Sequence, residues 1–339
     1  MRRKSLLALA VIPLLAIAGC ASGADEEPTN TSSSGDEVQF EAKDPLIIGY
    51  SVYDLQNPYW QAYSEGVKAG AEENGAEVVV ADQKSSQQEQ VSGSLDLINQ
   101  GISALIITPV QPSALPATID AAHDARIPVV IGDIGTAGDY DAYILSNNFN
   151  GGELAAQFVI DQAGDSTETK KVGVIELHAG SVVGEERVNG FKEALAEDDR
   201  FEVVASLDGE DTVDGGYAAA QDMLSANPDL DIIYAANDAS AVGAQRALET
   251  AGKSVADGFT LIGFDGNDDA LGLIEQGLMS ATVAQDPYGQ GKAAVETALA
   301  LLNGEDAGYS DADSKTVYFP VEIVTQATVA EFKAARADR

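Results

Sequence analysis

The regular alternation of short apolar runs with helical stretches constrains this chain most. Runs such as Ala104–Thr108 (ALIIT) and Ile127–Ile131 (IPVVI) are almost continuously apolar, which is typical of parallel strands buried on both faces. Amphipathic stretches of helical length separate these runs. A strand that is repeatedly followed by a helix predicts a doubly wound α/β fold.

The expected elements follow from this pattern. Strands are predicted at Leu46–Ser51, Glu77–Ala81, Ala104–Thr108, Pro128–Gly132, Ala142–Leu145, Lys171–Leu177, Phe201–Leu207, Ile232–Ala235, Thr260–Phe264, Ser280–Val283 and Val317–Val324. Helices are predicted at Tyr59–Asn74, Ser86–Gln100, Pro112–Ala125, Asn150–Ala163, Val183–Asp198, Val213–Ala226, Ala239–Ala251, Asp268–Gln276 and Tyr288–Leu302. Asn74-Gly75 and Gln100-Gly101 have the sequence of helix C-caps.

Two similar sets of strand–helix units stand on either side of Ser146-Asn147-Asn148. A folded body of roughly 295 residues also exceeds what one hydrophobic core usually serves. We therefore expect two lobes, with a boundary near these residues.

The N-terminal segment has the order of an export signal. Met1–Lys4 is basic, Leu6–Ala18 is apolar but too short to span a membrane, and Ile17-Ala18-Gly19-Cys20 resembles a bacterial lipobox. We predict a signal peptide at 1–20, a lipid on Cys20 and a flexible polar tether at 21–44. A plain secretory signal with a chance cysteine is the alternative.

Composition excludes several classes of protein. The formal charge is −36, so neither nucleic acid nor an anionic membrane surface is an expected partner. Such acidity fits a protein kept soluble by its charge or one that lives in salt. Cys20 is the only cysteine, which excludes a disulfide framework and a cysteine-based metal site.

The sequence offers no set of residues for catalysis. His123 and His178 are the only histidines and have no neighbouring ligands at metal-binding spacing, and neither a G-x-S-x-G nor a Walker A pattern occurs. The glycine-rich turn Gly132–Gly138 leads into a strand, whereas a dinucleotide-binding turn would open a helix. We predict that the chain is not an enzyme and needs no cofactor or metal.

Amide or carboxylate side chains follow five of the predicted strands. These residues are Asn57, Asp133, Asn237, Asp265 and Gln285. Open α/β sheets bind ligands at the carboxyl ends of their strands, and this mixture of donors and acceptors suits a neutral polyhydroxylated ligand. Helix capping is the alternative at each single position, and we favour it for Asp238, since Asn237 lies nearer the strand end.

Three further side chains fit such a ligand. Tyr59 and Trp60, the only Trp, lie at the junction between the first predicted strand and the helix that follows it. Aromatic faces stack on the apolar face of a sugar ring. Arg187 would supply a planar set of donors. A surface charge on a helix is the alternative for Arg187.

These residues carry a family resemblance that runs from about Asp44 to about Gln326. The chain resembles the periplasmic sugar-binding proteins of the ribose-binding type, the solute receptors of ABC importers. The matching motifs are Asn57-Pro58-Tyr59-Trp60, Ile127–Val130, Asn148 with Gly151-Gly152, Arg187-x-x-Gly190-Phe191, Ala236-Asn237-Asp238, Gly263–Gly266 and Val283–Gln285.

The resemblance implies two α/β lobes joined by three crossings, near Ser146-Asn147, Gln285-Asp286 and Pro320-Val321, with the ligand held between lobes that close by a hinge. It implies an N-terminal lobe of 45–146 plus 286–320 and a C-terminal lobe of 147–285 plus 321–339.

The resemblance also implies that Asn57, Tyr59, Trp60, Asp133, Arg187, Asn237, Asp265 and Gln285 contact the ligand. Tyr53 and Asp54 are predicted to join them as ligand-binding residues. Tyr53 replaces a polar residue in the first loop, which is two residues longer here and adds Asp54 and Gln56. Ile134 stands where the family often carries Arg, which argues against ribose itself. Pentoses, hexoses, sugar alcohols and cyclitols all stay open as ligands.

The function that follows is that of a lipid-anchored extracytoplasmic protein on a bacterial membrane. As a monomer, it would capture a sugar or polyol and deliver it to an ABC permease. A receptor of the same fold that feeds a sensor kinase or chemoreceptor is the alternative. A transcription regulator would need an N-terminal DNA-reading module where the export signal stands.

Overall fold

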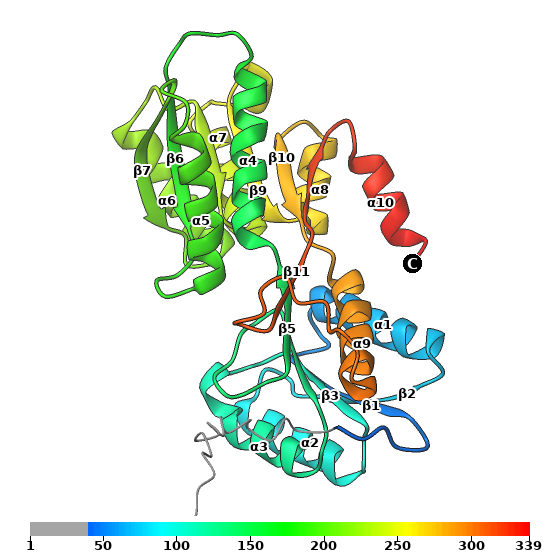
Figure 1. The fold of residues 1–339 in the computed structure, drawn as a ribbon. Helices are drawn as coiled ribbons and strands as arrows, with labels where there is room; N and C mark the ends of the chain where they lie inside the picture. Colours follow the sequence, from blue (N-terminus) through cyan, green and yellow to red (C-terminus); the bar gives the residue numbers. More distant parts are fainter. Residues whose placement is uncertain (1–39) are drawn as a thin grey trace, which may run out of the picture. The chain divides into compact units, whose positions relative to one another are not determined.

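The computed structural model describes residues 40–339, which form two six-stranded sheets. Sheet A has the strand order β11-β5-β4-β3-β1-β2, and sheet B has the order β12-β10-β9-β8-β6-β7 (Figure 1). The predicted fold of two doubly wound α/β lobes is confirmed. The predicted signal peptide and Cys20 lie outside the described residues.

Sheet A is parallel throughout. Its strands are β1 (Ile47–Val52), β2 (Glu77–Asp82), β3 (Ala104–Ile107), β4 (Val129–Gly132), β5 (Ala142–Ser146) and β11 (Thr316–Phe319). Sheet B consists of β6 (Lys170–Glu176), β7 (Phe201–Asp208), β8 (Ile232–Ala235), β9 (Thr260–Asp265), β10 (Ala281–Ala284) and β12 (Glu322–Thr325). Only β12 runs antiparallel to its neighbour, which is β10.

The predicted strand Val317–Val324 is wrong in one respect, because it is two strands in two different sheets. β11 ends at Phe319 in sheet A, and β12 begins at Glu322 in sheet B. Pro320 lies between them and has no backbone N–H to donate to a ladder, so the apolar run continues while the pairing stops. The chain also passes between the sheets after β5 and after β10.

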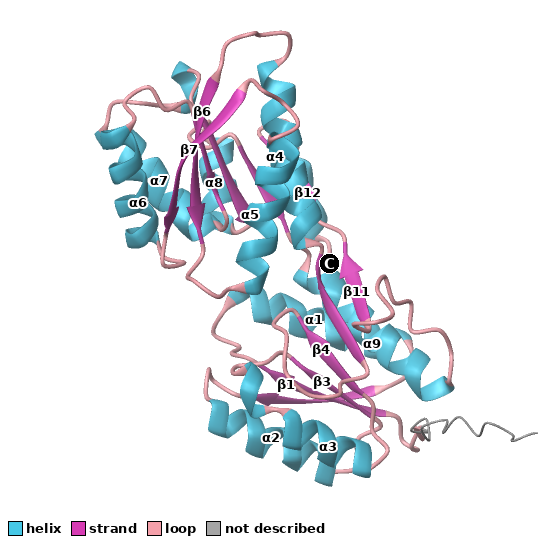
Figure 2. Cartoon of the chain, turned by 60° about the vertical axis from the view of Figure 1, so that its left-hand side comes forward, coloured by secondary structure: helices cyan, strands magenta, loops and turns pink. Residues whose placement is uncertain are grey.

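Helices cover both faces of each sheet (Figure 2). They are α1 (Pro58–Glu73), α2 (Gln87–Asn99), α3 (Pro116–Asp124), α4 (Asn148–Ala163), α5 (Val182–Leu195), α6 (Val213–Ala226), α7 (Asp238–Thr250), α8 (Asp268–Glu275), α9 (Pro287–Asn303) and α10 (Val329–Ala337). The predicted C-caps are confirmed, since Gly75 and Gly101 follow α1 and α2 with φ of 68° and 82°.

Two of the helix predictions need correction. The expected helix Pro112–Ala125 is a short 3₁₀ turn, Pro112–Ala114, followed by α3, which begins at Pro116, because proline is tolerated only in the first turn of a helix. α10 was not predicted at all.

Each sheet has an apolar core on both faces. Ile48, Tyr50 and Val67 belong to the core under α1 and α9, while Leu105 and Ile119 belong to the core under α2 and α3. Sheet B has two cores of the same kind. The central strands are therefore buried on both sides, as their apolar runs predicted.

The end of the segment assigned to the tether lies against sheet A. Phe40 packs against the core under α1 and α9, and the Nζ of Lys43 donates to the carbonyl of Ile102 at 2.8 Å. No helix within residues 40–339 has the length and apolar character needed to cross a membrane.

Close helix packing depends on glycine at the α1–α9 contact. A Cβ on Gly66 would lie 1.9 Å from the carbonyl oxygen of Tyr288, and a Cβ on Gly291 would lie 2.2 Å from that of Tyr63. Backbone atoms cannot move aside as a flexible side chain can, so the two helices need glycine at both positions.

We expect Gly66→Ala to lower the free energy of unfolding by about 1–3 kcal/mol through overpacking. Gly272→Ala in α8 is the matched control, since nothing lies within 4 Å of its built Cβ and alanine favours a helix by up to about 1 kcal/mol. Urea unfolding of both variants measures the difference. Equal stability of the two variants would contradict the packing described.

Candidate ligand-binding site

A cavity of about 650 Å³ lies where strand ends of the two sheets face each other. Eight of the ten predicted ligand residues line it: Asn57, Tyr59, Trp60 and Asp133 from the side of sheet A, Arg187, Asn237 and Asp265 from the side of sheet B, and Gln285 at the crossing after β10. Tyr53 and Asp54 do not line it. The carboxyl ends of the strands thus converge on one space, as the topology requires.

Asn57 has the capping role that was weighed as an alternative. Its Oδ1 accepts from the backbone N–H of Tyr59 at 2.8 Å and so caps α1, with Pro58 in the first turn. The side-chain amide nitrogen of Asn57 has no hydrogen bond within residues 40–339. Capping uses the acceptor of Asn57 and leaves its donors for the cavity.

Three aromatic rings pack against one another at the wall of the cavity. Trp60 is only 5% exposed, with the ring of Tyr53 stacked on it at 5.4 Å and 16° and Tyr59 edge-on at 4.8 Å and 86°. Tyr53 therefore supports Trp60 from behind and does not face the cavity.

Asp133 is held at the end of β4 with φ of 59°, a left-handed conformation that is uncommon for residues other than glycine. Its Oδ1 accepts from the Tyr59 hydroxyl at 2.6 Å. Burial raises the pKa of Asp133, and the Tyr59 hydrogen bond and the charge of Arg187 only partly oppose this. Burial also raises the pKa of Tyr59 well above its ordinary value, with Asp133 adding to the effect.

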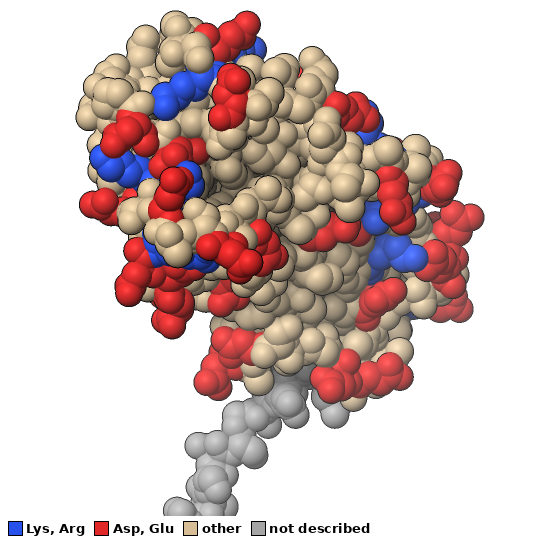
Figure 3. All heavy atoms as spheres, turned by 90° about the horizontal axis from the view of Figure 1, so that it is seen from above, with Lys and Arg blue, Asp and Glu red and all other residues tan. Residues whose placement is uncertain are grey.

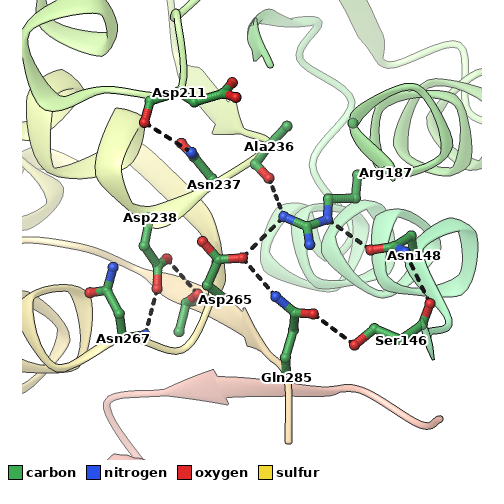
Figure 4. A network of polar contacts seen from close by, with 12 residues as sticks. Ser146, Asn148, Arg187, Asp211, Ala236, Asn237, Asp238, Asp265, Asn267 and Gln285 are labelled. Carbon is green, nitrogen blue, oxygen red and sulfur yellow. Dashed lines mark hydrogen bonds and ion pairs between the residues drawn. The ribbon is translucent and has the colours of Figure 1, made fainter. Parts of the chain in front are cut away.

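Arg187 is buried, so the alternative of a surface charge is wrong. Figure 4 shows its guanidinium among three partners: Nε donates to Asn148 Oδ1 at 2.9 Å, and Nη1 donates to the Ala236 carbonyl at 2.9 Å and to Asp265 Oδ1 at 3.0 Å. The group also lies 3.8 Å from the centre of the Phe264 ring, at cation–π distance.

Asp265 connects this guanidinium to the crossing between sheets. Its backbone φ is 128°, and Gly266 follows with φ of 75°, so a strained backbone places the carboxylate. The Gln285 amide donates to Asp265 at 2.9 Å, and the Ser146 hydroxyl donates to Gln285 Oε1 at 2.7 Å. Burial raises the pKa of Asp265 although Arg187 opposes it.

The expectation that Asp238 caps a helix is wrong. Asn237 is the cap of α7 and accepts from Ser240 N at 2.9 Å. Asp238 is fully buried and accepts from the Thr282 hydroxyl at 2.7 Å and from Asn267 N at 2.8 Å. It ties the loop after β9 to β10, and burial together with the charge of Asp265 raises its pKa well above the ordinary value.

The other positions that the sequence singled out lie outside the cavity. Asp54 accepts from the Ser85 hydroxyl at 2.7 Å and from Gln56 N at 2.9 Å, and so orders its own loop. Ile134 packs on the core under α1 and α9. Asp211 was not singled out by the sequence; it accepts from the backbone N–H of His178 at 2.9 Å and holds the loop beside Asn237.

The residues of the site that were missed include Gln290 and Arg336. Gln290 of α9 is fully buried and donates to the Tyr59 hydroxyl at 3.2 Å and to Ser146 Oγ at 3.1 Å. Arg336 of α10 lines the cavity. Neither follows a strand, so the pattern of strand ends could not find them. Within residues 40–339, no cluster of His, Cys, Asp and Glu has the arrangement of a metal site.

The match to known proteins agrees with this architecture. Residues 48–306 match the family model described as periplasmic binding protein domain. The chain belongs to this family. Two binding proteins of known name are similar to it over most of their length. The ribose import binding protein of Bacillus subtilis is 32% identical over 96% of this chain and 99% of its own length. The D-allose-binding periplasmic protein of Escherichia coli is 30% identical, and the match covers 69% of this chain and 77% of that protein.

Among solved structures, this binding protein is similar to an ABC transporter periplasmic solute binding protein from Actinobacillus succinogenes with bound D-allose. The identity is 26%, the TM-score is 0.71, and the match covers 84% of this chain and 99% of that one. Its close relatives are binding proteins and not enzymes. The resemblance to the ribose-binding type is confirmed, and the relatives are extracytoplasmic proteins.

The raised pKa of Asp238 leads to a testable prediction about how stability depends on pH. The folded protein holds this proton more tightly than the unfolded chain, so the contribution to stability is full below pH 3.8 and is lost as pH rises through the raised pKa. Asp238→Asn should therefore gain stability relative to the parent as pH rises above 4 and through the raised pKa of Asp238. Unfolding by urea across this range measures the change.

Asp269→Asn, at an exposed position in the next helix, is the control and should track the parent. A constant difference between Asp238→Asn and the parent at every pH would contradict the assignment.

Proposed function

We propose that this binding protein captures a neutral sugar, sugar alcohol or cyclitol between its lobes and delivers it to an ABC importer. One observation carries the proposal: a single cavity joins an aromatic wall to carboxylates and amides drawn from both sheets. Such a site can accept from hydroxyls, donate to them and cover a ring face at once.

The charge of the cavity favours a neutral ligand over an anionic one. Asp133, Asp265, Asp268 and Asp269 line it against two cations, Arg187 and Arg336. The molecular surface is also acidic, and Figure 3 shows more acidic than basic side chains on the face it draws. An anionic sugar would enter against this field.

Each side chain has a role in this proposal. Asp133 accepts from ligand hydroxyls with the oxygen that Tyr59 leaves free, and Asn57 and Asn237 donate with their amide groups. Tyr59 and Trp60 together form the aromatic wall against which a ring of the ligand lies, and Arg187 with Asp265 and Gln285 forms the opposite wall. Residues 45–146 with 286–320 and residues 147–285 with 321–339 would close on the ligand as two rigid lobes.

Location and partners are part of the same proposal. The extracytoplasmic relatives and the lipobox-like sequence that ends at Cys20 support a lipid-anchored monomer at the membrane of a bacterium, working with a permease. A receptor that passes the same ligand signal to a sensor kinase or chemoreceptor is the second candidate. A permease encoded beside this protein would favour import.

A ligand screen tests the proposed function. The melting temperature of the protein is measured with each of five ligands: D-ribose, D-allose, L-arabinose, myo-inositol and glycerol. A ligand at 100 times its Kd adds about 2.7 kcal/mol of stability. We expect at least one to raise the Tm and to change the emission of Trp60. No shift with any sugar, polyol or cyclitol would refute the carbohydrate assignment.

Asp133→Asn tests the role of the carboxylate. Asparagine keeps an acceptor for the Tyr59 hydroxyl, so the Tm should not fall, but the charge-assisted bonds to the ligand are lost. We expect calorimetric Kd to rise at least tenfold, about 1.4 kcal/mol. The control Asp120→Asn, exposed on α3, should leave Kd unchanged. An unchanged Kd for Asp133→Asn would remove this residue from the site.

A further inference from the structure

The C-terminal helix α10 brings a second guanidinium to the cavity. Arg336 lines the same space as Arg187, Asp265 and Gln285, although it lies thirty residues beyond the last residue, 306, matched by the family model. Figure 1 shows α10 next to α8, whose first residues also line the cavity.

The structure fixes Arg336 beside a ligand residue. Its Nη1 donates to the carbonyl oxygen of Gly266 at 2.8 Å, and Gly266 directly follows Asp265. Asp268 is a weaker partner, 3.7 Å away and with a side chain that is 87% exposed, so solvent screens this ion pair. The guanidinium also lies 5.6 Å from the centre of the Phe332 ring.

Within residues 40–339, Arg336 has more hydrogen-bond donors left free than Arg187 has. A guanidinium carries five N–H groups. Arg187 engages both Nε and Nη1 and its side chain is 7% exposed. Within residues 40–339, Arg336 makes hydrogen bonds only through Nη1, and its side chain is 38% exposed. Nε and Nη2 of Arg336 are thus available to a ligand.

The sheet A side of the cavity has few strong donors of its own. Asp133 is an acceptor, and Ile134 is packed into the core and offers no hydrogen bond. A hydroxyl that donates to Asp133 still has lone pairs to be satisfied. The guanidinium donors of the cavity come from the sheet B side alone, through Arg187 and Arg336.

We propose that Arg336 is a specificity-determining residue, which donates from Nε and Nη2 to a hydroxyl or ring oxygen of the neutral sugar or polyol. The inference rests on the proposed function of the cavity. It assigns to α10 a part in ligand selection.

The anchoring of α10 does not rest on Arg336 alone. α10 is already held to its lobe by Val329, which is 3% exposed in the core, and by Phe332 packed against the same core. Lys333, about one turn earlier on the helix, forms its own ion pair with Glu275 at 3.0 Å. Lys333 is therefore the matched control, a cation on the same helix that does not line the cavity.

The experiment uses the full chain and three variants, Arg336→Ala, Arg336→Lys and Lys333→Ala. Kd is measured by calorimetry for D-ribose, D-allose, L-arabinose and myo-inositol, and for the monodeoxy analogues of whichever binds most tightly. We expect Arg336→Ala to weaken the tightest ligand at least tenfold, Arg336→Lys to recover only part of this, and Lys333→Ala to change Kd less than twofold.

The deoxy analogues separate ligand contact from anchoring. If Arg336 donates to one oxygen, the parent discriminates at least tenfold against the analogue that lacks it, and Arg336→Ala shrinks that one ratio to about twofold or less. Equal weakening of every analogue, or no weakening, would overturn the inference. A parent protein that binds none of the sugars would instead refute the proposed function, and this inference with it.

Discussion

The buried guanidinium of Arg187 is the interaction on which the site is built. A charge taken out of water is costly unless it is paired and hydrogen-bonded, and here three elements supply the partners. Asn148 begins α4, Ala236 follows β8, and Asp265 ends β9. Removing one partner of such a group typically costs about 3–5 kcal/mol, so each of these elements is held in register by the same charge.

The same charge connects the site to the crossings between the sheets. From Asp265 the hydrogen bonds run through Gln285 to Ser146, then through Gln290 to the Tyr59 hydroxyl and Asp133. Two carboxylates that belong to different sheets are thus linked by side chains that lie at or beside the crossings. A ligand that bonds both carboxylates would bias this network toward one arrangement of the lobes, which is what closure by a hinge requires.

The strands and most of the cavity residues were predictable from the sequence, because they depend on short stretches of the chain. Buried parallel strands need continuous apolar runs, so every predicted strand except Val317–Val324 was found within one or two residues. Polar residues at the ends of such strands must meet at one edge, so Asp133, Asp265 and Gln285 were found together. Capping did compete with binding, and Asn57 and Asn237 turn out to cap their helices while still lining the cavity.

The rest depends on tertiary structure that no local pattern encodes. The run Val317–Val324 looks like one strand because periodicity does not show which sheet a residue joins. Tyr53 lies behind Trp60 and Asp238 is buried behind Asn237, because packing against distant parts of the chain decides which of two adjacent side chains faces the cavity. Arg336 and Gln290 come from helices that approach the cavity only after both sheets are assembled.

The most direct test of the account is a crystal structure of the protein with the sugar or polyol that gives the largest thermal shift. The account predicts the ligand between the two sheets, with hydroxyls within hydrogen-bond distance of Asp133 and Asn237 and a ring face against the aromatic wall. A ligand bound elsewhere on the molecule, with the cavity filled only by water, would contradict it.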